Sequence, residues 1–249
     1  MRNLNTVAVV LASGSGERFG TQKLPKHLTP ILGVPILNWT LDAIFKTNLF
    51  SAVVVVTSHE NLKHTQKSIN AFFEKSSIPI LLTEGSVQRS ESFNLGLQSL
   101  INHKFIDAKS IIALFDANRP FVSQLQLQEL HKTVQVHECA CPGRPVINGV
   151  AISSLGKITR VPPKDHFVEF VTPEFLRLDS FNLPLQNFLR GHNCFVEFAL
   201  DSGFEPVMIK STQLNAKLTY PEDRTYMEGL ALNNKLVVPK AVKIGWVID

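Results

Sequence analysis

Cysteine is scarce in this sequence, and long apolar stretches are missing. The 249 residues include 3 cysteines, Cys139, Cys141 and Cys194. An odd, sparse set of thiols is typical of a reducing compartment and excludes a disulfide-stapled secreted domain. No apolar run reaches the roughly 18 residues of a transmembrane helix, and the first residues lack the pattern of a signal peptide. The sequence therefore predicts a cytoplasmic protein with no membrane partner.

The chain also lacks a block of basic residues. Lys and Arg total 25 against 21 acidic residues, so a net charge of +4 is spread along the chain. A nucleic-acid-binding surface needs a concentrated basic patch, and this balance instead favours a phosphorylated small molecule as the partner.

Two zinc-site patterns are incomplete. Cys139 and Cys141 have no second cysteine pair to complete a structural site. His59 and His64 are five positions apart, one more than the spacing that places two imidazoles on one helical face. The sequence does not predict a zinc site.

Two common nucleotide-binding fingerprints are absent as well. After Gly14 and Gly16, the third glycine of a dinucleotide fingerprint would fall on Phe19. No Gly-Lys-Ser or Gly-Lys-Thr of a Walker loop occurs in the chain. These spacings argue against hydride transfer and against a P-loop NTPase.

A glycine-rich turn is nevertheless present after the first apolar run. Residues 7–11, Val-Ala-Val-Val-Leu, are typical of a parallel strand buried on both faces. In the turn that follows, small residues let peptide N–H groups converge on an anion, and Arg18 and Lys26 flank it. The residues we assign to nucleotide binding here are Ala12, Ser13, Gly14 and Gly16. A tight strand-to-helix turn with incidental basic residues is the alternative.

The rest of the chain follows a β-α rhythm that predicts an α/β fold with a mostly parallel sheet. Further strands are expected over 52–56, 78–82, 111–115 and 205–209. Helices are expected over 37–45, 62–75, 92–102, 124–136 and 183–189, with a last helix ending near 233. Pro79 favours an edge position or an irregular entry for its strand, and Gly156 centres a hairpin. No linker divides the chain, so we expect one domain over residues 1–249 with an antiparallel arm at about 139–170.

Two polar segments provide further candidate site residues. Arg89 and Ser92 begin a helix, where they can address a base or a phosphate; an ordinary helix capped by Ser90 or Ser92 is the alternative. Asp116 follows an apolar strand, at the end where ligands bind in open α/β sheets. A carboxylate near a phosphate loop is a natural magnesium ligand, so we expect Mg²⁺ as a cofactor, with an Asx turn or helix cap as the alternative.

Five motifs in order resemble the 2-C-methyl-D-erythritol 4-phosphate cytidylyltransferases and their relatives that act on ribitol 5-phosphate. The motifs occupy residues 11–27, 84–92, 116–120, 171–173 and 217–223. The resemblance implies a Rossmann-like, GT-A-like nucleotidyltransferase sheet with helices on both faces, in a homodimer clasped by the hairpin arm. It also implies transfer of CMP from CTP to a polyol phosphate with release of pyrophosphate.

The resemblance implies a role for each site residue. Arg18 and Lys26 match the pair that stabilises the pentacoordinate α-phosphorus, and Lys217 a catalytic lysine near the α-phosphate. Asp116 matches the acid that holds the metal. The nucleotide-binding residues of the second motif are Gly85, Ser86, Arg89 and Ser92. The substrate-side residues are Arg119 and Lys164.

The sequence departs from the family mainly on the side of the acceptor. Pro145-Val146 replaces an Asp-Thr pair, Lys164 replaces an arginine, and Asn193-Cys194-Phe195 replaces a Thr-Asp-Glu cluster. The acceptor is therefore left open between a polyol and a sugar phosphate. Two alternatives are a nucleotidyltransferase for a different sugar phosphate and a degenerate nucleotide-binding paralogue without turnover.

Overall fold

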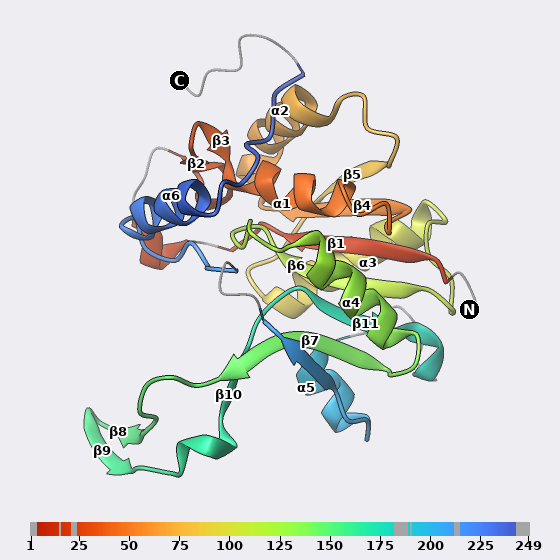
Figure 1. The fold of residues 1–249 in the computed structure, drawn as a ribbon. Helices are drawn as coiled ribbons and strands as arrows, with labels where there is room; N and C mark the ends of the chain where they lie inside the picture. Colours follow the sequence, from red (N-terminus) through yellow and green to blue (C-terminus); the bar gives the residue numbers. More distant parts are fainter. Residues whose placement is uncertain are drawn as a thin grey trace.

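A mixed sheet forms the centre of the computed structural model, which describes residues 4–14, 16–20, 24–181, 189, 191–211 and 215–242 (Figure 1). Its strand order is β10-β7-β11-β6-β1-β4-β5, and β12 also pairs with β7. The strands are β1 (Thr6–Leu11), β4 (Ala52–Thr57), β5 (Ile80–Glu84), β6 (Ile111–Asp116), β7 (Cys139–Pro145), β10 (Val168–Phe170), β11 (Glu174–Arg177) and β12 (Val207–Lys210). The block β6-β1-β4-β5 is parallel, and β5 lies at the sheet edge, as Pro79 predicts.

Helices cover both faces of this sheet. The helices are α1 (Ile36–Phe45), α2 (Leu62–Phe73), α3 (Arg89–Asn102), α4 (Gln124–Val134), α5 (Phe195–Asp201) and α6 (Asp223–Asn233). Because strand side chains alternate, Ala8 and Val10 pack in the core with α1 and α4, while Val7 and Val9 pack in the core with α3 and α5. The predicted α/β fold, a mostly parallel sheet with helices on both faces, is confirmed. Among the described helices, none is long and apolar enough to cross a membrane.

Two local expectations are corrected. Residues 139–145, assigned to the arm from their Pro and Gly content, form β7, which pairs with β10, β11 and β12 inside the sheet. Helix α3 begins at Arg89 and its N-cap is Gln88, which makes no side-chain capping bond, so Ser90 and Ser92 are not caps. Residues 183–188 of an expected helix lie outside the described part of the chain.

A hairpin extends away from the sheet, as predicted (Figure 1). It consists of β8 (Ile152–Ser154) and β9 (Lys157–Arg160), joined at Leu155 and Gly156, which have φ values of 49° and 77°. The short helix η4 (Lys164–His166) follows it before β10. A small hairpin, β2 (Pro30–Ile31) with β3 (Val34–Pro35), precedes α1.

Candidate functional site

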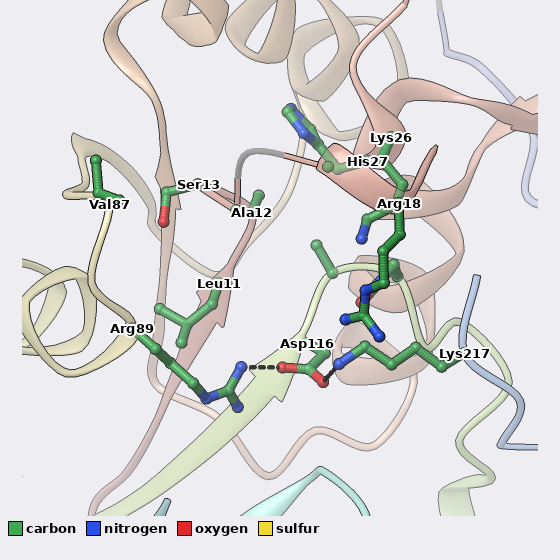
Figure 2. Close-up of a pocket in the computed structure, with 14 residues that line it drawn as sticks. Leu11, Ala12, Ser13, Arg18, Lys26, His27, Val87, Arg89, Asp116 and Lys217 are labelled. Carbon is green, nitrogen blue, oxygen red and sulfur yellow. Dashed lines mark hydrogen bonds and ion pairs between the residues drawn. The ribbon is translucent and has the colours of Figure 1, made fainter. Parts of the chain in front are cut away.

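A cavity of about 410 Å³ lies at the carboxyl ends of β1 and β6 (Figure 2). This is the edge of a parallel sheet where the connecting loops converge and leave room for a ligand. The cavity contains most of the predicted site residues. They are Ala12, Ser13, Gly14, Gly16, Arg18, Lys26, Arg89, Asp116 and Lys217.

The glycine-rich turn is anchored to the neighbouring strand. The Ala12 amide donates to the Val56 carbonyl at 2.7 Å, and Gly16 adopts a φ of 68°, which glycine tolerates without strain. On the next strand end, the Gly85 amide donates to the Thr57 carbonyl at 2.7 Å. A Cβ on Gly85 would lie 2.7 Å from the Ser13 Cβ, so a side chain there would push the turn out of place. Glycine at 85 therefore sets the distance between the two segments.

Ser92 joins the turn to the segment that contains Ser86. Its hydroxyl accepts from the Ser86 amide at 2.9 Å and donates to the Ser86 carbonyl at 2.8 Å. Because the Ser92 proton is used in this way, the Ser13 hydroxyl, 2.8 Å away, donates to Ser92. The predicted nucleotide-binding residues Gly85, Ser86 and Ser92 thus lie directly against the glycine-rich turn, although the cavity itself is bordered there by Val87.

Asp116 is the buried centre of a group of cations. Its Oδ1 is 2.6 Å from Arg89 Nη1, and its Oδ2 is 2.9 Å from Lys217 Nζ (Figure 2). Arg119 Nε lies 3.5 Å from the same Oδ2. The carboxylate side chain is 7% exposed. Burial alone would raise the pKa of Asp116, but Arg89 and Lys217 outweigh it and hold that pKa well below its usual range. Asp116 is therefore ionised at physiological pH.

Lys26 and Arg18 are the cations of the cavity without an acidic partner at ion-pair distance, among the residues that the structure describes. Lys26 lies in the short helix η2 (Lys26–Leu28), whose N-cap is Pro25. Burial, Lys217 and Arg18 together lower the pKa of Lys26. Two adjacent cations without a counter-ion in a cavity form a site for an anion.

The cavity fits a metal ion only together with a ligand. Among the described residues, Asp116 is the one acidic side chain that lines the cavity. The described part of the chain also contains no cluster of three or more His, Cys, Asp or Glu side chains that could hold a metal ion. Mg²⁺ is commonly held by one or two carboxylates plus substrate phosphates. The donor set therefore suits an ion that arrives on a polyphosphate and replaces a cation on one Asp116 oxygen.

The two predicted substrate-side residues lie apart from each other. Arg119 does not line the cavity but lies next to it, because its Nε is 3.5 Å from Asp116 Oδ2 and its Nη1 donates to the Asn215 carbonyl at 2.9 Å. Lys164 lies in η4, beyond the hairpin, and its ammonium donates to the Ile147 carbonyl at 3.4 Å. Lys164 is not among the residues that line the cavity of its own chain.

Sequence reasoning missed two features of this region. His27, buried beside Lys26, borders the cavity. Glu174, 2% exposed, accepts from the Phe195 and Val196 amides at 2.6 and 3.2 Å, and burial raises its pKa to about 7. Arg89 reaches the same region, because its Nε donates to the Asn193 carbonyl at 2.9 Å. The surroundings of both residues are made by parts of the chain that are distant in sequence. His27 could have been found from its position in the first motif, next to Lys26, whereas no motif indicates Glu174.

Comparison with known proteins assigns the chain to a family. The model of the family described as 2-C-methyl-D-erythritol 4-phosphate cytidylyltransferase matches residues 6–231. A ribitol-5-phosphate cytidylyltransferase of Lactiplantibacillus plantarum is 22% identical over 220 residues, which cover 87% of this chain and 94% of that protein. A 2-C-methyl-D-erythritol 4-phosphate cytidylyltransferase of Xylella fastidiosa is 26% identical over 228 residues, covering 89% and 94%. The solved structure of the Francisella tularensis enzyme of that name has a TM-score of 0.72 at 17% identity, covering 91% and 99%.

Proposed function

The chain belongs to the 2-C-methyl-D-erythritol 4-phosphate cytidylyltransferase family, and from this premise we propose that it transfers CMP from CTP to a polyol phosphate. The observation that carries the proposal is the charge of the cavity. Arg18, Lys26, Arg89 and Lys217 line it, and Asp116 is the one acid among its described lining residues. This excess of positive charge complements a nucleoside triphosphate and an acceptor phosphate bound side by side.

The nucleotide would lie between the glycine-rich turn and the start of α3. The turn supplies backbone amides for the phosphates, as the small residues Gly14 and Gly16 allow. The segment held by Ser92, at Gly85 and Ser86, would read the base. Its backbone geometry is fixed before binding, which lowers the conformational entropy lost when the base docks.

In the reaction, an oxygen of the acceptor phosphate attacks the α-phosphorus of CTP. A new P–O bond forms, the bond from the α-phosphorus to the bridging oxygen breaks, and pyrophosphate leaves with that electron pair. The acceptor is already an anion, so no general base is needed, and positioning and charge stabilisation dominate the catalysis. Lys26 and Arg18, which lack acidic partners within the described residues, would stabilise the charge that develops at the α-phosphorus.

Magnesium belongs to this proposal as a cofactor that accompanies CTP. When bound, it would neutralise phosphate charge, and Asp116 would be its protein ligand. Arg89 or Lys217 would then leave one carboxylate oxygen and become available to a phosphate.

We also propose a homodimer in the cytoplasm, in which the arm of one subunit completes the site of the other. The hairpin and its flanks expose apolar side chains, Leu155 at 100%, Ile158 at 70% and Val161 at 71%. Exposed apolar groups of this size favour a protein partner. The separation of Lys164 from the cavity of its own chain supports a role in the partner's site.

The direct test is turnover of CTP. The protein is incubated with CTP, Mg²⁺ and one acceptor at a time: methylerythritol phosphate, ribitol phosphate, glycerol phosphate or a sugar phosphate. The release of pyrophosphate and the formation of the CDP-linked product are measured. We expect turnover with at least one polyol phosphate and a preference for CTP over UTP, GTP and ATP. Turnover only with another nucleoside triphosphate and a sugar phosphate would support the alternative of a nucleotidyltransferase for a different sugar phosphate. Binding of CTP without turnover of any acceptor would support the degenerate paralogue.

A further inference from the structure

His27 occupies a buried position directly behind the cavity. It is 4% exposed and follows Lys26 in η2. Its Nε2 lies 2.8 Å from the Thr65 hydroxyl and 3.5 Å from the Thr57 hydroxyl. In Figure 2 the imidazole points away from Asp116, so it is directed at the scaffold and not at a reacting group.

The two threonines connect His27 to the rest of the site. Thr57 ends β4, and its carbonyl accepts the Gly85 amide; the carbonyl of Val56, one residue earlier, accepts the Ala12 amide. Thr65 is a buried residue of α2. These hydrogen bonds therefore link η2, which contains Lys26, to the end of β4. The end of β4 in turn holds the glycine-rich turn at Ala12 and the second nucleotide-binding segment at Gly85.

The electrostatic environment keeps this link uncharged. Burial and the neighbouring Lys26 lower the pKa of His27 to about 4. A charged imidazole would add to the repulsion that Lys217 and Arg18 already exert on Lys26. A neutral imidazole instead exchanges hydrogen bonds with hydroxyl groups without competing for the phosphate.

We propose that His27 is a positioning residue for cytidylyl transfer, which fixes the ammonium of Lys26 relative to the glycine-rich turn through Thr57 and Thr65. The inference rests on the proposed function. It assigns His27 no proton transfer, because the ring is directed away from the reacting groups and the acceptor is already anionic. Its contribution is geometric, since a displacement of a catalytic group by about 1 Å costs up to about a hundredfold in rate.

The test compares two substitutions. His27→Gln keeps a polar group near the position of Nε2, whereas His27→Phe keeps a ring and removes the hydrogen bond to Thr65. We expect His27→Phe to lower kcat by about tenfold to a hundredfold with the KM for CTP changed less than about threefold. His27→Gln should recover most of the lost rate. In a Lys26→Ala background, His27→Phe should have no further effect, because His27 acts through Lys26.

A second measurement does not depend on turnover. Acetylation of Lys26 by acetic anhydride, followed by mass spectrometry of the folded protein, should change several-fold in His27→Phe and match the wild type in His27→Gln. If His27→Phe does not fold, Thr65→Val removes the same hydrogen bond and should give the same shift. Unchanged Lys26 reactivity in these variants would overturn the proposal. It would also be overturned if His27→Phe lowered kcat by the same factor in the wild type and in the Lys26→Ala background. Wild-type protein without turnover would overturn the proposed function, and the acetylation result would still decide the link between His27 and Lys26.

Discussion

The Arg89 guanidinium donates to the Asp116 carboxylate across 2.6 Å, although the two residues are 27 positions apart in the chain. The same guanidinium donates to the Asn193 carbonyl at 2.9 Å, so Arg89 connects the start of α3, the end of β6 and the chain before α5. Lys217 occupies the other oxygen of Asp116 at 2.9 Å. A triphosphate that enters the cavity competes with Asp116 for these cations. Ligand binding and the local ion pairs are therefore coupled.

Asp116→Asn tests this coupling. The amide keeps the size of the side chain but leaves Arg89 and Lys217 without their counter-charge. We expect loss of activity and a lower free energy of unfolding, since removal of one partner from a buried ion pair is strongly destabilising. Turnover at increasing Mg²⁺ and thermal unfolding measure the two effects. The control is Asp201→Asn, because Asp201, at the end of α5, pairs with His192 and its side chain is 69% exposed. Full recovery of turnover at high Mg²⁺ would remove Asp116 from the essential metal ligands.

Lys26→Ala separates catalysis from binding. A cation aimed at charge that develops in the transition state affects kcat more than KM. We expect kcat to fall by about a hundredfold to a thousandfold, with a much smaller change in the KM for CTP. Lys67→Ala, at an exposed position of α2, is the matched control. Equal kcat values for Lys26→Ala and Lys67→Ala would contradict the catalytic assignment.

The sequence predicts the parallel block of the sheet well, because its strands are apolar on both faces. Residues 52–57 and 111–116 form buried strands, as their uninterrupted apolar runs indicate. It does not predict β7, whose Pro142, Gly143 and Pro145 are typical of turns. This strand forms because β11, β10 and β12 pair with it, and these partners are distant in the chain. Gly143 also leaves the space that the Met208 side chain fills.

The candidate site divides in the same way. The glycine-rich turn and Asp116 are predictable, since each is encoded by a local motif at a strand end. The ion pairs of Asp116 with Arg89 and Lys217 join elements 27 and 101 positions apart, and no local pattern encodes them. The environment of Glu174 likewise depends on the amides of α5, a helix that the sequence analysis missed. Tertiary packing, and not motif content, places these groups.

Ser92→Ala tests the base-reading segment. The substitution removes the bonds to the Ser86 backbone and the contact with Ser13, so the segment and the turn lose their mutual position. We expect the KM for CTP to rise about five- to tenfold, as the loss of hydrogen bonds worth about 1 kcal/mol implies. Steady-state kinetics with CTP and UTP measure the effect. Ser90→Ala, two positions earlier in the sequence, is the control, and identical KM values for both variants would contradict the role of Ser92.

Glu174→Gln tests a pH dependence of stability. The pKa of Glu174 is raised from 4.5 to about 7, so the folded protein holds this proton more tightly than the unfolded chain. The resulting stabilisation is complete below the unfolded pKa and is lost as the pH rises through about 7. A glutamine still accepts the two α5 amides but does not titrate. We therefore expect the Tm of the wild type, relative to Glu174→Gln, to fall between about pH 5 and about pH 8.

Glu169→Gln is the control for this comparison, because Glu169 pairs with Arg144 at the surface and its side chain is 44% exposed. Its Tm difference from the wild type should change little over the same range. A Tm difference for Glu174→Gln that is constant with pH would show that Glu174 keeps one protonation state throughout.

Mixed dimers provide the sharpest test of the arm. If Lys164 acts in the partner's site, Lys164→Ala and Lys26→Ala each inactivate a homodimer. A mixed dimer regains one complete site, in which the Lys164→Ala subunit contributes its own Lys26 and receives Lys164 from its partner. After random exchange of subunits, half of the dimers are mixed, so we expect about a quarter of the wild-type activity per chain. The activity of the mixture, measured against each variant alone, decides the point. Exchange confirmed by native mass spectrometry without recovery of activity would place Lys164 outside the partner's site.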